Sequence, residues 1–181
     1  MGRHLKRCAW AVGEPLISYH DTEWGTPVHD ERRLFEFLIL EGAQAGLSWV
    51  TILKKRDAYR KAFDRFDPKK VARYTARDVA RLLKDAGIVR NRAKITSAIG
   101  NAKAFLAIQK EHGSFDGYVS GFTDAAVLSG DLRKRGMRFV GPTIVESLME
   151  GIGVLNHHEI GCYRRAALLM GEERGPRRRR E

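Results

Sequence analysis

The sequence predicts an all-α protein, and three observations support that fold class. Apolar residues recur at the three- and four-residue spacing of a helix face over most of the chain. Residues that cap helices, or a proline at the first helical position, stand at the start of most of these segments. Strand patterns are scarce, and the best of them, residues 137–140, is short.

The first half of the chain is expected to contain four helices after an aromatic-rich segment. Residues 16–25 have no helical apolar period and are interpreted as a structured loop or a short turn of helix. Asp30 can cap a helix over 31–45, whose apolar residues fall on a single face. Three further helices are expected: 48–63, capped by Ser48 and with its basic residues 54–56 outward, 67–74, from Asp67 and Pro68, and 75–86, from a capping box between Thr75 and Asp78.

The second half is expected to contain five helices joined by tight turns. The longest runs from about residue 90 to residue 109. Small capping residues or a Gly-Pro pair begin several of the others. These four are expected over 114–119, over 123–136, from 141 to 151 or 153, and over 162–170.

The composition indicates a globular protein with a polyanionic partner. The 181 residues carry a formal net charge of +11, and 43% of them are hydrophobic. A strongly basic chain is typical of nucleic-acid-binding proteins, although a solubilising surface gives the same charge. We expect residues 1–172 to form one compact domain, with two helical lobes around a pocket as an alternative arrangement. Residues 173–181 are expected to form a basic, disordered tail.

The lack of long apolar runs and the low number of cysteines predict the cellular setting. No apolar run approaches the roughly 18 residues that cross a bilayer, so no membrane partner is expected. Two cysteines are too few for a disulfide scaffold. We therefore expect a soluble, cytoplasmic protein, and we expect it to be a monomer.

The segment from Glu41 to Trp49 places an acid, small residues and a large aromatic ring between two apolar runs. A carboxylate in such surroundings loses hydration, which is costly or raises its pKa unless it gains a partner. Gly42, Ala43 and Gly46 allow another backbone or a flat ligand to come close. Two interpretations stay open: a site for a flat, polar or cationic ring, and an ordinary helix junction in which Trp49 belongs to the core.

Residues 82–95 predict two helices joined by a tight turn. Gly87 is expected to adopt the left-handed conformation that ends the first helix, and Ile88 to lie between the helices. Free amides at the turn and at the start of the second helix would then face a phosphate. Three basic residues flank that position: Arg90, Arg92 and Lys94. This order of residues favours a helix-hairpin-helix clamp on the DNA backbone over a plain helical hairpin with a solvated basic face.

Four residues near the two ends of the chain have side chains that bind transition metals: Cys8, His20, His158 and Cys162. Two thiolates and two imidazoles suit a closed, tetrahedral, structural zinc site, with one Zn²⁺ per chain. His157 is an alternative ligand to His158. From spacing alone, two buried free thiols and two unrelated histidines account for the pattern too. A disulfide between the cysteines is disfavoured in a reducing cytosol.

Taken together, these segments resemble the DNA-3-methyladenine glycosylase I family. The resemblance rests on Arg-Cys-Ala-Trp, Tyr-His-Asp-Thr-Glu-Trp-Gly, Leu-Glu-Gly with Gln-Ala-Gly-Leu-Ser-Trp, Lys-Lys-Arg, Asp-Ala-Gly-Ile, Phe-Val-Gly with Thr-Ile, and the final Asn, His, Gly and Cys of residues 156–162. These motifs follow one another over most of the chain. Between Pro15 and His20 the chain is one residue shorter than the family pattern, and Ile17 stands where the family often has a further tyrosine.

The resemblance implies a helix-hairpin-helix DNA glycosylase acting in base excision repair. Such an enzyme flips and excises 3-methyladenine from alkylated double-stranded DNA by hydrolysing the N-glycosidic bond. The resemblance also implies zinc on the four Cys and His residues named above. Glu41 is then the catalytic residue that hydrogen-bonds the flipped base. The other implied roles are stacking by Tyr19 and Trp49, a nearby position for Trp24, and a wedge in the duplex formed by Leu47.

Two other functions also fit the sequence. One is a non-enzymatic helix-hairpin-helix DNA-binding protein in which the aromatic residues are only core. The other is a glycosylase for a different alkylated base. A zinc hydrolase is disfavoured because four protein ligands leave no open position for water.

Overall fold

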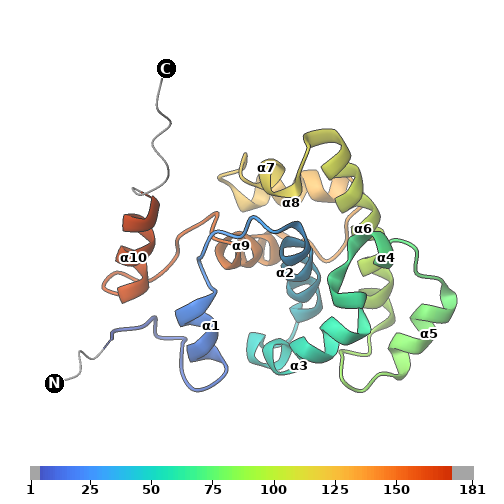
Figure 1. Cartoon of the computed structure of the whole chain (residues 1–181), viewed down its shortest axis with the longest axis horizontal. Helices are drawn as coiled ribbons and strands as arrows, with labels where there is room; N and C mark the ends of the chain where they lie inside the picture. Colours follow the sequence, from blue (N-terminus) through green and yellow to red (C-terminus); the bar gives the residue numbers. More distant parts are fainter. Residues whose placement is uncertain (1–4, 173–181) are drawn as a thin grey trace.

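The computed structural model describes residues 5–172, and every regular element in that range is helical (Figure 1). The elements are α1 (Leu16–Thr22), α2 (Glu31–Gln44), α3 (Trp49–Ala62), the 3₁₀ turn η1 (Asp64–Phe66), α4 (Pro68–Val71), α5 (Ala76–Lys84), α6 (Arg92–His112), α7 (Phe115–Val119), α8 (Ala125–Lys134), α9 (Pro142–Gly151) and α10 (Tyr163–Glu172). The all-α prediction is confirmed for this range. The basic tail expected at 173–181 lies outside the described residues.

Local capping explains where several helices begin. Asp30 accepts a hydrogen bond from the backbone amide of Arg33, and Ser48 accepts one from that of Thr51, as predicted. Predicted caps also begin α4, α7 and α8: Asp67, Ser114 and Asp124. Helix α4 is shorter than expected and ends at Val71 rather than near residue 74. The short turn of helix expected within residues 16–25 is α1.

Residues 137–140 do not form the short strand that their sequence suggested. Phe139 has φ +56°, a left-handed value that a strand does not contain. The side chain of Asn101, on α6, takes the place of a strand partner, since its Nδ2 donates to the carbonyl of Arg138 and its Oδ1 accepts from the amide of Arg138, both at 2.9 Å. These bonds satisfy the backbone of a partly buried loop without a sheet.

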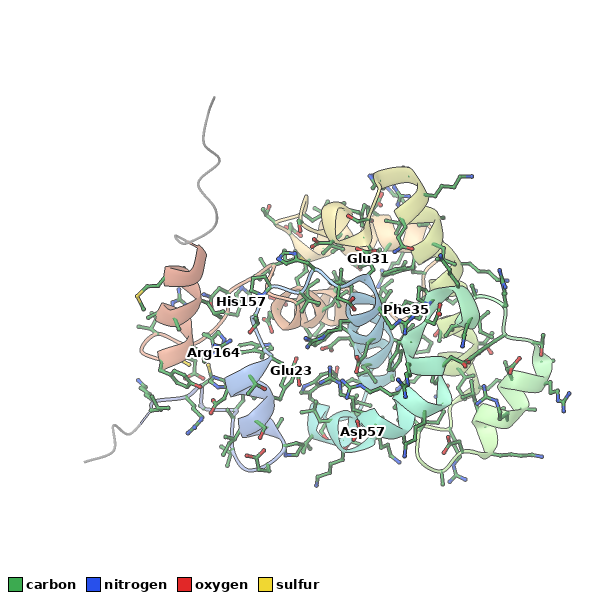
Figure 2. The ribbon with its side chains drawn as sticks, viewed as in Figure 1. Glu23, Glu31, Phe35, Asp57, His157 and Arg164 are labelled. Atoms are coloured by element: carbon green, nitrogen blue, oxygen red, sulfur yellow. The ribbon has the colours of Figure 1, made fainter. Side chains whose placement is uncertain are left out.

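Helix α2 lies at the centre of the molecule, with α3, α6 and α9 packed against it (Figure 1). Every residue from Leu34 to Ala43 is buried, so the helix is enclosed on all sides over this length. Phe35, labelled in Figure 2, packs against Phe105 of α6 with their ring centroids 5.2 Å apart. The last turn of α2, which carries Glu41, is therefore part of the protein interior.

The segments near the two ends of the chain lie side by side. The amide of Tyr163, at the start of α10, donates to the carbonyl of Lys6 at 2.9 Å. Arg164 donates from Nη2 to the hydroxyl of Thr26 at 2.6 Å. These contacts hold α10 beside the N-terminal segment and α1. Between residues 5 and 172, no helix has both the length and the apolar character needed to cross a membrane.

Candidate functional site

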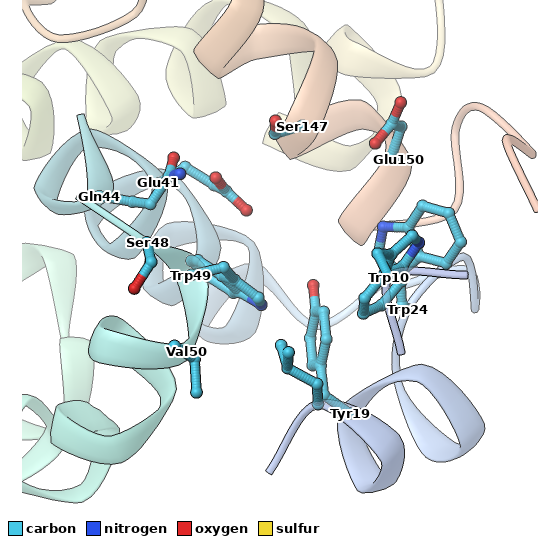
Figure 3. A pocket seen from close by; sticks show the side chains of 11 residues that line it. Trp10, Tyr19, Trp24, Glu41, Gln44, Ser48, Trp49, Val50, Ser147 and Glu150 are labelled. Carbon is cyan, nitrogen blue, oxygen red and sulfur yellow. The ribbon is translucent and has the colours of Figure 1, made fainter. Parts of the chain in front are cut away.

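A cavity of about 360 Å³ opens between the end of α2, the start of α3, α1 and α9 (Figure 3). This volume lies within the range of small-ligand pockets and suits a single planar ring system. The side chains that line the cavity are mostly aromatic or polar: Trp10, Leu16, Tyr19, Trp24, Glu41, Gln44, Ser48, Trp49, Val50, Ser147 and Glu150. None of the eleven is basic, in a chain whose net charge is +11.

Glu41 points into this cavity from the last turn of α2 (Figure 3). Its side chain is buried, and no group among residues 5–172 donates a hydrogen bond to it. Burial, with a smaller contribution from the carboxylate of Glu150 on α9, raises the pKa of Glu41 to about 8. This raised pKa favours the protonated form of Glu41 at neutral pH, and a ligand that carries positive charge would favour its ionised form.

Aromatic rings form the wall that faces Glu41. The rings of Tyr19 and Trp49 lie 5.4 Å apart with their planes tilted by 57°. The rings of Trp10 and Trp24 meet edge to face at 4.9 Å. Such a wall offers π faces to a flat ligand, and π faces attract positive charge.

The structure brings together all four residues predicted to contact the ligand, Tyr19, Trp24, Glu41 and Trp49. Sequence reasoning missed the α9 wall, because Ser147 and Glu150 lie between two matching motifs and belong to neither. Trp10 also lines the cavity, and its place in the matching motif Arg-Cys-Ala-Trp, two residues after Cys8, was a signal that could have revealed it. Ile17, which stands where the family often has a further tyrosine, is not among the residues that line the cavity; its neighbour Leu16 lines it from the start of α1.

A buried ion-pair network holds the aromatic segment against α3. Arg56 is buried, contrary to the outward position expected for it. Its Nε donates to Oε1 of Glu36 at 2.6 Å, and its Nη1 donates to both carboxylate oxygens of Glu23, at 2.9 and 2.8 Å. The two paired carboxylates are what make the burial of this guanidinium tolerable. Because Glu23 directly precedes Trp24, the network fixes that side of the cavity.

The turn between α5 and α6 differs from the predicted glycine cap. Gly87 does not have a left-handed φ; instead Asp85 ends α5 and accepts from the amide of Gly87 through its Oδ1, at 2.7 Å. Space explains why glycine is present, since a Cβ there would lie 2.8 Å from the Cβ of Ala58 and 2.9 Å from Oδ1 of Asp85. Ile88 is buried, as expected.

Helix α3 contacts this turn through the side chain of Lys55. Lys55 donates from Nζ to the carbonyls of Ala86 and Gly87, at 3.0 and 3.4 Å. Beyond the turn, Arg90 and Arg92 are exposed, and among residues 5–172 nothing accepts from their backbone amides. The start of α6 therefore presents free amides and basic side chains to solvent, which is the arrangement that binds phosphate.

Lys94 does not flank that position as expected. Its Nζ donates to the carbonyls of Ala43 and Ala45, at 2.8 and 2.6 Å. These carbonyls lie at the end of α2 and have no acceptor role within the helix, so the ammonium caps the helix end. The loop that follows carries Leu47, whose side chain is exposed. The structure thus places the Leu47 loop beside the hairpin, with Lys94 between them.

The four predicted metal ligands form one buried cluster. Their ligand atoms all lie within 4.8 Å of one another. Nδ1 of His158 is 3.5 Å from the sulfur atoms of both Cys8 and Cys162, and Nε2 of His20 is 3.4 Å from the sulfur of Cys162. Both cysteines are free thiols. The alternative ligand His157 lies outside the cluster, where its Nδ1 is 2.6 Å from Oε1 of Glu150.

A second layer of contacts orients the two imidazoles of the cluster. Nδ1 of His20 lies 2.8 Å from Oδ1 of Asp21, and Asp21 is itself paired with Arg7. Nε2 of His158 lies 3.2 Å from the carbonyl of Trp24. Partners of this kind fix the ring orientation of metal-binding histidines, so the cluster can hold a metal ion. The Trp24 contact also joins the cluster to the wall of the cavity.

An acid at the end of a central helix, an aromatic cavity large enough for one base and a basic hairpin beside it define an all-helical DNA glycosylase. The chain belongs to the methyladenine glycosylase family, whose model matches residues 10–165. The family resemblance noted in the sequence is thereby confirmed.

Relatives match over almost their whole length. DNA-3-methyladenine glycosylase 1 of Escherichia coli (strain K12) is 44% identical over 179 residues, covering 87% of this chain and 96% of that protein. A crystal structure of 3-methyladenine DNA glycosylase I has 44% identity and a TM-score of 0.82, covering 87% of this chain and 98% of the other. A Staphylococcus aureus structure described as the structural basis of 3-methyladenine recognition has 37% identity and a TM-score of 0.82, covering 89% and 97%.

Proposed function

We propose that this protein excises 3-methyladenine from alkylated double-stranded DNA, by hydrolysing the bond between the base and deoxyribose, as a step of base excision repair. One observation carries the proposal: Glu41 is buried in an aromatic cavity of about 360 Å³, and none of the described residues forms a hydrogen bond with it. A ligand that brings positive charge and a hydrogen-bond donor stabilises the charged form of such an acid most strongly. The names of the relatives agree with this choice of base.

The charge of the base selects it. Methylation at N3 makes adenine cationic while it is attached to the sugar. As this cation enters, Glu41, whose pKa burial has raised to about 8, releases its proton to solvent. The resulting carboxylate accepts a hydrogen bond from the exocyclic amine, and the rings of Tyr19 and Trp49 stack on the base. Neutral adenine brings no charge to offset ionisation of Glu41, and it also pairs better in the duplex.

The reaction requires little acid catalysis. The cationic base is a good leaving group, and it departs as neutral 3-methyladenine when the bond to deoxyribose breaks. Water adds to the sugar carbon and loses a proton. The main task of the protein is therefore to extract the base from the stack, at a cost of about a few kcal/mol, and to hold it. Glu41 is the residue that we assign to this binding.

The DNA is held beside the cavity. We assign the phosphate contacts to the start of α6, with Arg90 and Arg92, and to the turn at Gly87 and Ile88. Such contacts fix the protein on the duplex without reading its sequence. We assign to Leu47, which is exposed on the neighbouring loop, the role of filling the gap that the flipped base leaves. We expect one domain over residues 1–172 to act as a monomer.

We assign the buried Cys and His cluster to one structural Zn²⁺. In a tetrahedral site with Zn–S of about 2.3 Å and Zn–N of about 2.0 Å, sulfur and nitrogen ligands lie about 3.5 Å apart. The sulfur–nitrogen distances of 3.4 and 3.5 Å in the cluster fit that geometry. Four protein ligands leave no position for a reacting water, so the metal would only tie the N-terminal aromatic segment to the C-terminal region.

Chromatography of the bases released from methylated DNA tests the proposal. We expect 3-methyladenine in the soluble fraction, and we expect Glu41→Gln to reduce its release while duplex binding is retained. Duplex binding without any released base would identify a DNA-binding protein instead and overturn the proposal. Release of another alkylated base alone would overturn the choice of 3-methyladenine and identify a glycosylase of different selectivity.

A further inference from the structure

Lys94 is a basic residue in the DNA-binding hairpin whose side chain turns away from the DNA-binding position. Two of its three ammonium protons are engaged by the carbonyls of Ala43 and Ala45, at 2.8 and 2.6 Å. The residue is half-buried, and this burial lowers its pKa. Arg92, two residues earlier on the same helix, is exposed. The two cations therefore differ in environment although they are close in sequence.

The loop that Lys94 contacts is closed on itself. The amide of Leu47 donates to the carbonyl of Gln44 at 2.6 Å, and Nε2 of Gln44 donates to the carbonyl of Leu47 at 3.1 Å. Gly46 has φ +75°, which allows the reversal. These bonds shape the loop but do not attach it to another helix. The ammonium of Lys94 makes that attachment to α6.

We propose that Lys94 is a positioning residue that holds the Leu47 loop and the Glu41 end of α2 at a fixed place relative to the phosphate-binding hairpin. The inference rests on the proposed function and deepens it. Because Lys94 bonds to two carbonyls at the end of α2, it fixes both the loop and the helix end that aims Glu41. The hairpin sets the position on the DNA backbone, and Lys94 transmits that position to the wedge and the pocket.

This role predicts an effect on base excision rather than on binding. Replacing Lys94 with Gln shortens the side chain and removes the ammonium, which weakens both contacts to the carbonyls and lets the loop shift. A displacement of about 1 Å at a reacting site lowers rates by about a hundredfold. We therefore expect the single-turnover rate of 3-methyladenine release at saturating DNA to fall about ten- to a hundredfold. Affinity for undamaged duplex should change by less than about twofold.

The salt dependence of duplex binding separates this role from a phosphate contact. Each phosphate contact contributes about 0.9 to the slope of log affinity against log salt concentration. Lys94→Gln should leave the slope unchanged, whereas the matched control Arg92→Gln should lower it by about 1. Lys94→Arg keeps the charge but not the compact ammonium, so it should not restore the excision rate.

A double-mutant cycle with Leu47→Ala completes the test. If Lys94 acts through the wedge, the losses in base extrusion caused by Lys94→Gln and Leu47→Ala are strongly non-additive. Extrusion is measured as the fluorescence rise of 2-aminopurine stacked beside the target base, with circular dichroism to show that each variant is folded.

Two results would overturn the inference: a salt slope that falls by about 1 in Lys94→Gln, or additive losses with Leu47→Ala. The salt and fluorescence measurements need no bond cleavage. A wild-type protein that extrudes bases but releases none would therefore refute the proposed function while these measurements still decide the role of Lys94.

Discussion

As pH rises, the Glu41→Gln variant should become increasingly more stable than the wild type. The same variant should be a poorer glycosylase. The carboxyl group has a pKa of about 8 in the folded protein, against an ordinary value of 4.5. Between these values the folded state holds a proton that the unfolded state has lost, so the free energy of unfolding falls as pH increases. Gln does not titrate and keeps the shape of the side chain. The free energy of unfolding of the variant therefore does not show this decrease with pH.

The magnitude follows from the two pKa values. Linkage gives a stability difference between Glu41→Gln and the wild type that grows by about 3 kcal/mol from about pH 5 to about pH 8. Above about pH 8 the difference stops growing, because Glu41 is then ionised in both states. The same substitution removes a hydrogen bond to a charged acceptor, so release of 3-methyladenine should fall about 10- to 100-fold.

Urea denaturation at a series of pH values measures the first effect, and single-turnover base release measures the second. Glu146→Gln is the matched control, because Glu146 is an exposed acid on α9 and does not line the cavity. Its stability difference from the wild type should not rise across this range. Parallel stability profiles for Glu41→Gln and the wild type would show that Glu41 is not held neutral by burial, and the reasoning about cation selection would be refuted.

Three further predictions follow from the same geometry. Gly87→Ala should lower the free energy of unfolding by about 1–3 kcal/mol, because its Cβ would be too close to Ala58. Gly100 has open space around it, so Gly100→Ala should not lower this free energy. Urea denaturation compares the two variants. Glu150→Gln should lower the pKa of Glu41, so binding of the permanent cation 3,9-dimethyladeninium, followed by tryptophan fluorescence, should reach its plateau at lower pH. Prolonged chelation of zinc should lower the melting temperature by more than about 5 °C, and added Zn²⁺ should restore it.

Local features of the fold were predictable because their causes are local. Asp30, Ser48 and Ser114 each cap a helix through a bond to an amide three residues away, and a few letters of sequence contain that information. The same reasoning failed at residues 137–140, where Asn101 supplies the backbone partners from a distant helix. It also failed for Arg56, whose two acidic partners come from other segments.

The all-helical class follows from the amino-acid sequence alone, as do the chemical types needed for a cationic base and for a metal and, through family motifs, the residues that carry them. Four features emerge from the folded arrangement instead: Glu41 has no hydrogen-bond partner within residues 5–172, Glu150 joins the cavity wall, Gly87 is required for space, and Lys94 contacts the end of α2. The physical reason is that burial, cavity shape and charge–charge distance depend on residues far apart in the chain, and no local pattern encodes them.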